Sequence, residues 1–148
     1  MQQNARGALD IITREVKMAG YNPNGASFLG VTYSTTQLMI QADLDSSGAI
    51  STSSTANERI TYAYDAANDR ITRAVGSGTA QVLAEHITAF DFTYLDSTGT
   101  TTTVSANIRQ VGISITAITA GPDPNYTADG GYRTYMVSAT ITPGNLAL

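Results

Sequence analysis

Residues 3 to 23 read QNARGALDIITREVKMAGYNP, and this stretch sets the plan of the chain. Its apolar residues recur at three- and four-residue steps, which is the period of one face of an α-helix. These residues are Ala5, Ala8, Leu9, Ile12, Val16 and Ala19. Arg6, Asp10, Arg14 and Lys17 fall on the opposite side, and Asp10 precedes Arg14 by the four residues that favour a helical ion pair. We therefore expect an amphipathic helix whose apolar stripe covers a sheet.

The two ends of this helix differ in their signals. Gly20 is expected to end it, and Asn22 with Pro23 prevents it from resuming. Its beginning has no Ser, Thr or Asp cap, because the chain opens with Met1 and two glutamines. The helix start is therefore either a frayed terminus or a point inside a longer helix.

After Pro23 the hydrophobic period changes to two, which predicts β-strands. Strands are expected over residues 28–33, 37–42, 59–64, 70–75, 87–95, 108–119 and 132–142. Turn-forming residues separate these segments, and residues 65–69 are expected to be a hairpin connection. One helix followed by about seven strands predicts an α+β fold, with the helix packed on antiparallel sheet. We expect a single domain over residues 1–148, with its helix at 3–20 and its β-rich part at 28–146.

The composition excludes several classes of site and partner. The chain has 148 residues, no Cys and one His, so it holds neither a cysteine-ligated metal site nor a cluster of histidines. Its net charge is −4 with only eight basic residues, so nothing supplies the basic patch that nucleic acid requires. No run of 18 apolar residues occurs, so no membrane span is expected within these residues.

Residues 43–50 read DLDSSGAI, which is the opening of an EF-hand-type calcium loop. Oxygen ligands at loop positions 1, 3 and 5 would be Asp43, Asp45 and Ser47, and position 7 would be the main-chain carbonyl of Ala49. Position 12 requires a bidentate Glu but is Ser54, and the nearest acid, Glu58, comes four residues late.

Two interpretations of this segment stay open. Asp and Ser with Gly also form ordinary turns, and two carboxylates are fewer than a calcium loop usually offers, which favours a turn alone. The alternative is a weak calcium site formed by Asp43, Asp45, Ser47, the Ala49 carbonyl and Glu58.

Other candidate sites are weaker. His86 follows Glu85, but adjacent residues of a strand point to opposite faces, so this pair is not expected to act as a general base. No second His, no Cys and no G-x-S-x-G motif accompanies it, and we expect the protein not to be an enzyme. The segment DPNYTADGG at 123–131 offers oxygen ligands without the spacing of a defined motif, and is expected to be a structural loop.

Six segments carry a family resemblance through their order and spacing. They are QQNARGALDIITREVKMAGYNP (2–23), ADLDSSGAI (42–50), NERITYAYDAANDRITR (57–73), VLAEHITAFDFTYLD (82–96), IRQVGISITA (108–117) and YRTYMVSATITPGNL (132–146). Together they resemble the PilW-type minor type IV pilins and the related GspJ-type pseudopilins of type II secretion. The chain departs from this pattern at Gly144, where many relatives have an Arg, and it has no Cys for the disulfides that some relatives form.

The resemblance implies a precursor with a short leader, a methylated N-terminus after cleavage, and about 20 apolar residues that span the inner membrane before assembly. None of that segment is in this chain, so we expect a soluble, monomeric piece that lacks the membrane-spanning half of its helix. Relatives often carry a more acidic sequence at 43–50, which favours a cation there.

The function that the resemblance implies is structural. A PilW-type subunit would prime or cap a type IV pilus together with other minor pilins, in the cell envelope and then outside the cell. A GspJ-type subunit would instead serve a secretion system in the periplasm. A third alternative from another class is an adhesin-like surface module whose loops at 43–57 and 121–131 contact a ligand. The amphipathic helix argues against that module, since free-standing binding domains have no use for half a helix.

Overall fold

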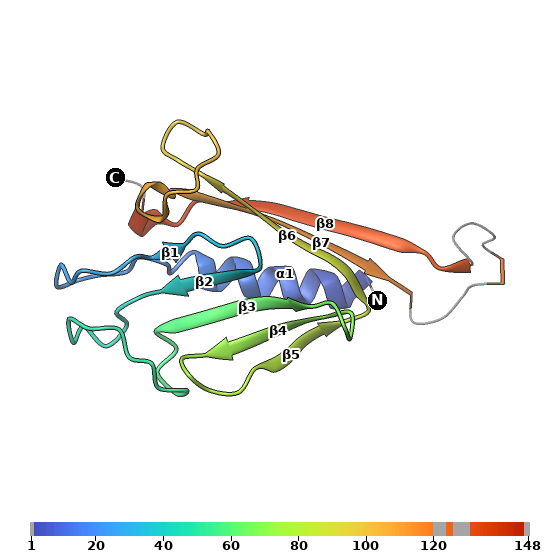
Figure 1. Cartoon of the computed structure of the whole chain (residues 1–148), viewed down its shortest axis with the longest axis horizontal. Helices are drawn as coiled ribbons and strands as arrows, with labels where there is room; N and C mark the ends of the chain where they lie inside the picture. Colours follow the sequence, from blue (N-terminus) through green and yellow to red (C-terminus); the bar gives the residue numbers. More distant parts are fainter. Residues whose placement is uncertain (1, 120–123, 126–130, 147–148) are drawn as a thin grey trace.

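The computed structural model describes residues 2–119, 124–125 and 131–146, and it places one helix against two antiparallel sheets (Figure 1). The helix α1 is Gln2–Val16. Sheet A contains β1 (Val31–Thr32), β2 (Gln37–Gln41), β3 (Arg59–Asp65), β4 (Arg70–Val75) and β5 (Gln81–Glu85) in chain order. Sheet B contains β6 (Ile87–Leu95), β7 (Gln110–Ile118) and β8 (Thr134–Ile141), also in chain order. Short 3-10 turns occur at η1 (Ser105–Asn107) and η3 (Gly144–Leu146).

The helix buries the stripe that its sequence predicts. Ala5, Ala8, Ile12, Val16 and Ala19 are at most 2% exposed, and Leu9 packs against them from the side. Arg6, Asp10 and Arg14 are exposed. The helix ends at Val16, and a turn then leads to Gly20, whose positive φ of 83° reverses the chain.

Side chains on one flank of α1 fix it to sheet A. The Asn4 amide donates to the Glu85 carbonyl at 2.7 Å, and the Arg73 Nε donates to the Glu15 carboxylate at 2.9 Å. The helix also contacts β7 and β8, so it lies against both sheets. No helix in the described residues is long and apolar enough to cross a membrane.

Alternation along the strands builds the core. In β7, Val111, Ile113, Ile115 and Ala117 are buried, while the residues between them are half-buried. The predicted hairpin at 65–69 is confirmed, because β3 and β4 pair directly from Ile60↔Val75 to Asp65↔Arg70. The α+β plan of one helix packed on antiparallel sheet therefore matches the expectation.

Two strands differ from the sequence-based expectation. The described residues hold eight strands instead of about seven, because Gln81–Glu85 forms β5. Its apolar residues Val82, Leu83 and Ala84 are consecutive, so they give no alternating signal. At the other edge of sheet A, β1 covers only Val31–Thr32 of the strand expected at 28–33.

His86 separates β5 from β6 and adopts a left-handed backbone, with φ of 58°. Its carbonyl accepts a hydrogen bond from the Ile118 amide at 2.9 Å, and the next amide, of Ile87, donates to the Asp69 carbonyl at 2.8 Å. The chain therefore passes from sheet A to sheet B at one exposed residue, which alternation alone would place inside a continuous strand.

Candidate functional site

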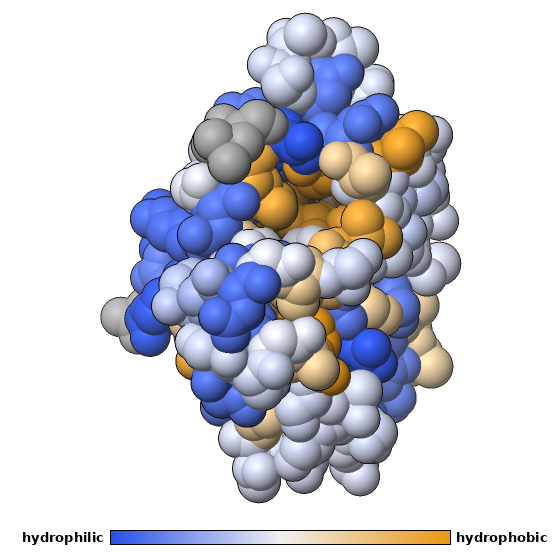
Figure 2. Space-filling model, turned by 90° about the vertical axis from the view of Figure 1, so that its left-hand side faces the viewer, coloured by the Kyte–Doolittle hydropathy of each residue, from blue (hydrophilic) through white to orange (hydrophobic). Residues whose placement is uncertain are grey.

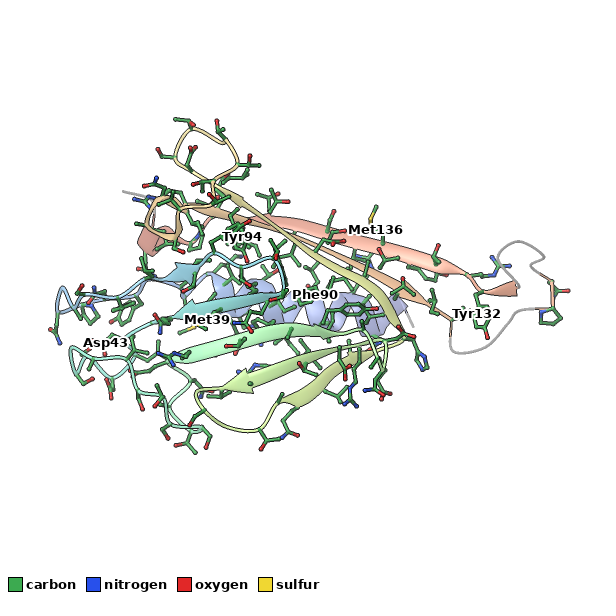
Figure 3. The ribbon with its side chains drawn as sticks, viewed as in Figure 1. Met39, Asp43, Phe90, Tyr94, Tyr132 and Met136 are labelled. Atoms are coloured by element: carbon green, nitrogen blue, oxygen red, sulfur yellow. The ribbon has the colours of Figure 1, made fainter. Side chains whose placement is uncertain are left out.

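The connection between β2 and β3 carries the predicted calcium ligands. The pairing of these strands continues one step beyond them, because the Ala42 amide donates to the Glu58 carbonyl at 2.9 Å. Asp43 then follows β2 and Glu58 precedes β3, so the two carboxylates start from neighbouring positions. Asp43 is 0% and Glu58 1% exposed. Figure 3 shows Asp43 where the chain leaves sheet A at the left-hand end of the molecule.

Each oxygen of these two buried carboxylates accepts a backbone N–H. Asp43 Oδ1 and Oδ2 accept from the amides of Ser47 at 3.1 Å and Gly48 at 2.9 Å. Glu58 Oε1 and Oε2 accept from the amides of Ser51 at 2.7 Å and Asp45 at 3.0 Å. A buried charge is tolerated only when such bonds replace water, so these four contacts explain how the loop folds around two anions.

Asp45 and Ser47 complete the turn. Asp45 is exposed, and its Oδ1 accepts from the Ser47 amide at 3.0 Å. Hydrogen bonding by Ser47, through its side chain first and its backbone second, lowers the pKa of Asp45 from its usual value. The Ser47 hydroxyl donates to the Ala49 carbonyl at 3.1 Å, so these two predicted ligands lie against each other.

The structure brings the three acids together. One carboxylate oxygen each from Asp43, Asp45 and Glu58 lies within 4.8 Å of the other two. Oxygen donors in this number and spacing suit a hard cation such as Ca²⁺, which binds carboxylate oxygens at about 2.3–2.6 Å. Because a carboxylate oxygen has two lone pairs, it can accept a backbone N–H and still face an ion.

Glu58 reaches this cluster because the preceding segment folds back. The Ser77 amide donates to the Thr52 carbonyl at 2.8 Å, which pins the segment against the connection between β4 and β5. A Cβ at Gly76 would lie 2.1 Å from that carbonyl oxygen, so only glycine fits there. Asn57 then turns the chain with φ of 57°. The four extra residues between position 12 of the motif and Glu58 are thus taken up by this detour.

A cavity of about 300 Å³ lies beside the acidic loop. Its apolar lining includes Ile11 from α1, Met18 from the turn after α1 and Leu44 from the loop, and Glu58 also borders it. Figure 2 views the end of the molecule where α1 finishes, and hydrophobic residues are gathered in a hollow in the upper half of this view. The sequence analysis did not predict this cavity. The signal for it was the presence of two apolar residues, Ile11 and Met18, outside the helical stripe.

The other candidates bring together no catalytic arrangement in the described part of the chain. His86 and Glu85 are both exposed, and no hydrogen bond joins them. Most of the loop at 123–131 lies outside the described residues, so the expectation for it stays a prediction.

Comparison with known proteins supports the fold. No family model matches the chain, and no curated protein matches it. The solved structure of the type IV-like pilin TTHA1219 from Thermus thermophilus is similar, with a TM-score of 0.61 and 13% sequence identity. The alignment covers 99% of this chain and 98% of that one. At this identity the likeness shows a pilin-like fold, and it does not distinguish a PilW type from a GspJ type.

Proposed function

We propose that this protein is a structural subunit of a pilin-type filament. The observation that carries the proposal is the pilin-like fold over nearly the whole chain. The finer assignment that we favour is a PilW-type minor pilin that primes or caps a type IV pilus with other minor pilins. A GspJ-like pseudopilin of a type II secretion system is the alternative.

The polar side of α1 is the surface that we assign to subunit contacts. Arg6, Asp10 and Arg14 are exposed, and Lys17 is exposed just after the helix ends. Mixed charges of this kind give little affinity by themselves in water, but they set the orientation of neighbours. The isolated chain is therefore expected to be monomeric or weakly associating, with other pilins or pseudopilins as its partners.

Site-specific photocrosslinking in the source cell tests this function. A photoreactive residue at Arg14 or Lys17 should give crosslinks to other pilin-type subunits, and the same residue at exposed Val82 on β5 is the matched control. Loss of surface pili on deletion of the gene would support a pilus role, and loss of protein secretion a pseudopilin role. Crosslinks formed only from the loop at 43–57, to a protein or glycan of another cell, would contradict both and support the adhesin-like alternative.

We further propose that the acidic loop binds Ca²⁺ weakly, through Asp43, Asp45 and Glu58 with Ser47 and the Ala49 carbonyl. The support is the grouping of the three carboxylates around one point. Bound calcium would neutralise two buried anions and would hold the loop surface in one conformation for contact with a neighbour.

A further inference from the structure

Among the described residues, the strand β8 forms an edge of sheet B. It pairs with β7 along its whole length, from Val111↔Ile141 to Ile118↔Thr134. Within the described residues no other strand pairs with it, and its backbone makes no hydrogen bond outside that ladder. Figure 1 shows β8 along the upper margin of the molecule. In an antiparallel edge strand about half of the residues turn both N–H and C=O outward, so β8 presents unpaired backbone groups.

The other edges of the two sheets are protected in ways that β8 is not. Natural edge strands are usually short, charged or interrupted by proline, because a long bare edge recruits further strands. In sheet A, β1 has two residues and β5 ends in Glu85. In sheet B, β6 carries Asp91, and the Tyr94 carbonyl on it accepts from the Thr102 amide at 2.9 Å. By contrast, β8 reads TYMVSATI, eight residues without a charge or a proline.

The side chains of β8 also favour a partner. Met136 is 71% exposed, more than any other large hydrophobic residue described, and Figure 3 shows it pointing away from the body of the protein. On the opposite face of the strand, Tyr135 and Ala139 are only half-buried, whereas Val137 and Ile141 are buried. A further strand beside β8 would place side chains next to Met136 on one face of the sheet and next to Tyr135 and Ala139 on the other.

We propose that β8 binds an extended, uncharged peptide segment of a partner protein, which joins sheet B as its fourth strand. Backbone hydrogen bonds would supply the affinity, and apolar residues at alternate positions would extend the core beside Tyr135 and Ala139. The mode of binding goes beyond the proposed filament role and does not depend on it.

The position of α1 favours an isolated peptide segment over a second copy of this chain as the partner of β8. α1 contacts β8 more than any other strand. Two copies joined through β8 in antiparallel order would bring both helices to the same face of the joined sheet, where their axes need about 8–10 Å of separation. A bare strand brings no second helix to that face.

A peptide with the sequence of β7 tests the edge directly, since β7 already pairs with β8 on its other side. We would add Gln110–Ile118 as a synthetic peptide with a lysine at each end, and follow amide hydrogen exchange in the intact chain. The outward amides of β8 should exchange at least about tenfold more slowly with the peptide bound. The same peptide N-methylated at alternate residues cannot form the ladder and should give no protection.

A pair of variants tests the side-chain contribution. Met136→Lys should weaken peptide binding at least about threefold, while Val82→Lys on the edge strand β5 should leave it unchanged. Absence of protection at millimolar peptide, or protection at β5 instead of β8, would overturn the proposal. Concentration-dependent protection of β8 without peptide, together with dimers in light scattering, would overturn the choice of occupant and assign a second copy. Loss of the filament role in the cell would leave all of these outcomes unaffected.

Discussion

Two parts of the molecule bury polar side chains against the backbone, and they do so with opposite chemistry. In the acidic loop at 42–58, the anions of Asp43 and Glu58 accept backbone N–H groups. At the seam between the sheets, the neutral hydroxyl of Tyr94 donates to the carbonyls of Ser34 at 2.9 Å and Gln37 at 3.3 Å. Tyr94 is 4% exposed and packs edge-on against the Tyr33 ring, with centroids 5.4 Å apart.

The difference between the two parts lies in range and in charge. The carboxylates bind amides 4 to 13 residues away in the sequence, so they organise their own loop. The Tyr94 hydroxyl binds carbonyls 57 and 60 residues away, so it joins separate parts of the fold. The loop should therefore respond to cations and acid, and the seam to alkali.

The largest effect is expected from Glu58→Ala. The change removes the acceptor for the Asp45 and Ser51 amides at a buried position and should lower the free energy of unfolding by about 2–3 kcal/mol. Urea denaturation measures it. Asp96→Ala is the matched control, because Asp96 Oδ1 also accepts two amides, of Thr98 and Thr100, but on an exposed turn. The control should lose less than about 1 kcal/mol, and equal losses would contradict the distinction by burial.

Calcium should have the next largest effect. With two or three carboxylates the dissociation constant is expected at ~10⁻⁴ to 10⁻³ M, and calcium at ten times that value stabilises the fold by about 1.4 kcal/mol. Thermal melts with calcium and with a chelator measure this shift. Asp45→Ala should abolish it without harming the fold, because Asp45 is exposed, and Asp96→Ala should retain it. If melts are indifferent to millimolar calcium, the loop is a turn and nothing more.

At the seam, Tyr94→Phe should lower the free energy of unfolding by about 1 kcal/mol at neutral pH. It removes the donor to Ser34 and Gln37 but keeps the ring in place. Tyr33→Phe in the neighbouring ring is the control, since no hydrogen bond of its hydroxyl occurs among the described residues. A loss of stability in the control as large as in Tyr94→Phe would show that the rings, and not the hydroxyl, hold the seam.

The remaining effects concern pH, and they have opposite signs in the two regions. Burial raises the pKa of Tyr94 to about 12. An unfolded tyrosine ionises near pH 10, so this stabilisation is complete below about pH 10 and is lost as the pH rises towards 12. Tyr94→Phe should reduce the loss of unfolding free energy between pH 10 and pH 12, measured by urea denaturation. Part of the loss should remain, because burial also raises the pKa of Tyr64. An unchanged loss would contradict the assignment to Tyr94.

In the acidic loop, hydrogen bonding by Ser47 lowers the pKa of Asp45. The contribution of the Asp45 carboxylate to folding stability is therefore present above about pH 3.9, and it is lost as the pH falls through the pKa of Asp45 in the folded protein.

Much of the fold follows from local pattern, and the exceptions have physical reasons. The helical stripe and the long alternating strands β3, β4, β6 and β7 were predictable, because one buried face imposes a period on the sequence. β5 was not, since its apolar residues are consecutive and only Ala84 is buried. In the acidic loop, the pattern located Asp43 and Asp45. The approach of Glu58 depends on Gly76, a contact between distant segments that no spacing rule contains.

Because the chain crosses from sheet A to sheet B at the single residue His86, it can be divided there into two fragments. Sheet A lies entirely before this residue and sheet B entirely after it, so a cut there leaves every strand ladder intact in one piece or the other. The two pieces are joined by the packing of α1 in the first against β7 and β8 in the second. Hydrogen bonds add to this packing, among them those from the Ile87 amide to Asp69 and from the Tyr94 hydroxyl to Ser34. The protein is thus built as two complementary fragments, 1–85 and 87–148, and can be studied as a split pair whose reassembly reports on the helix–sheet interface.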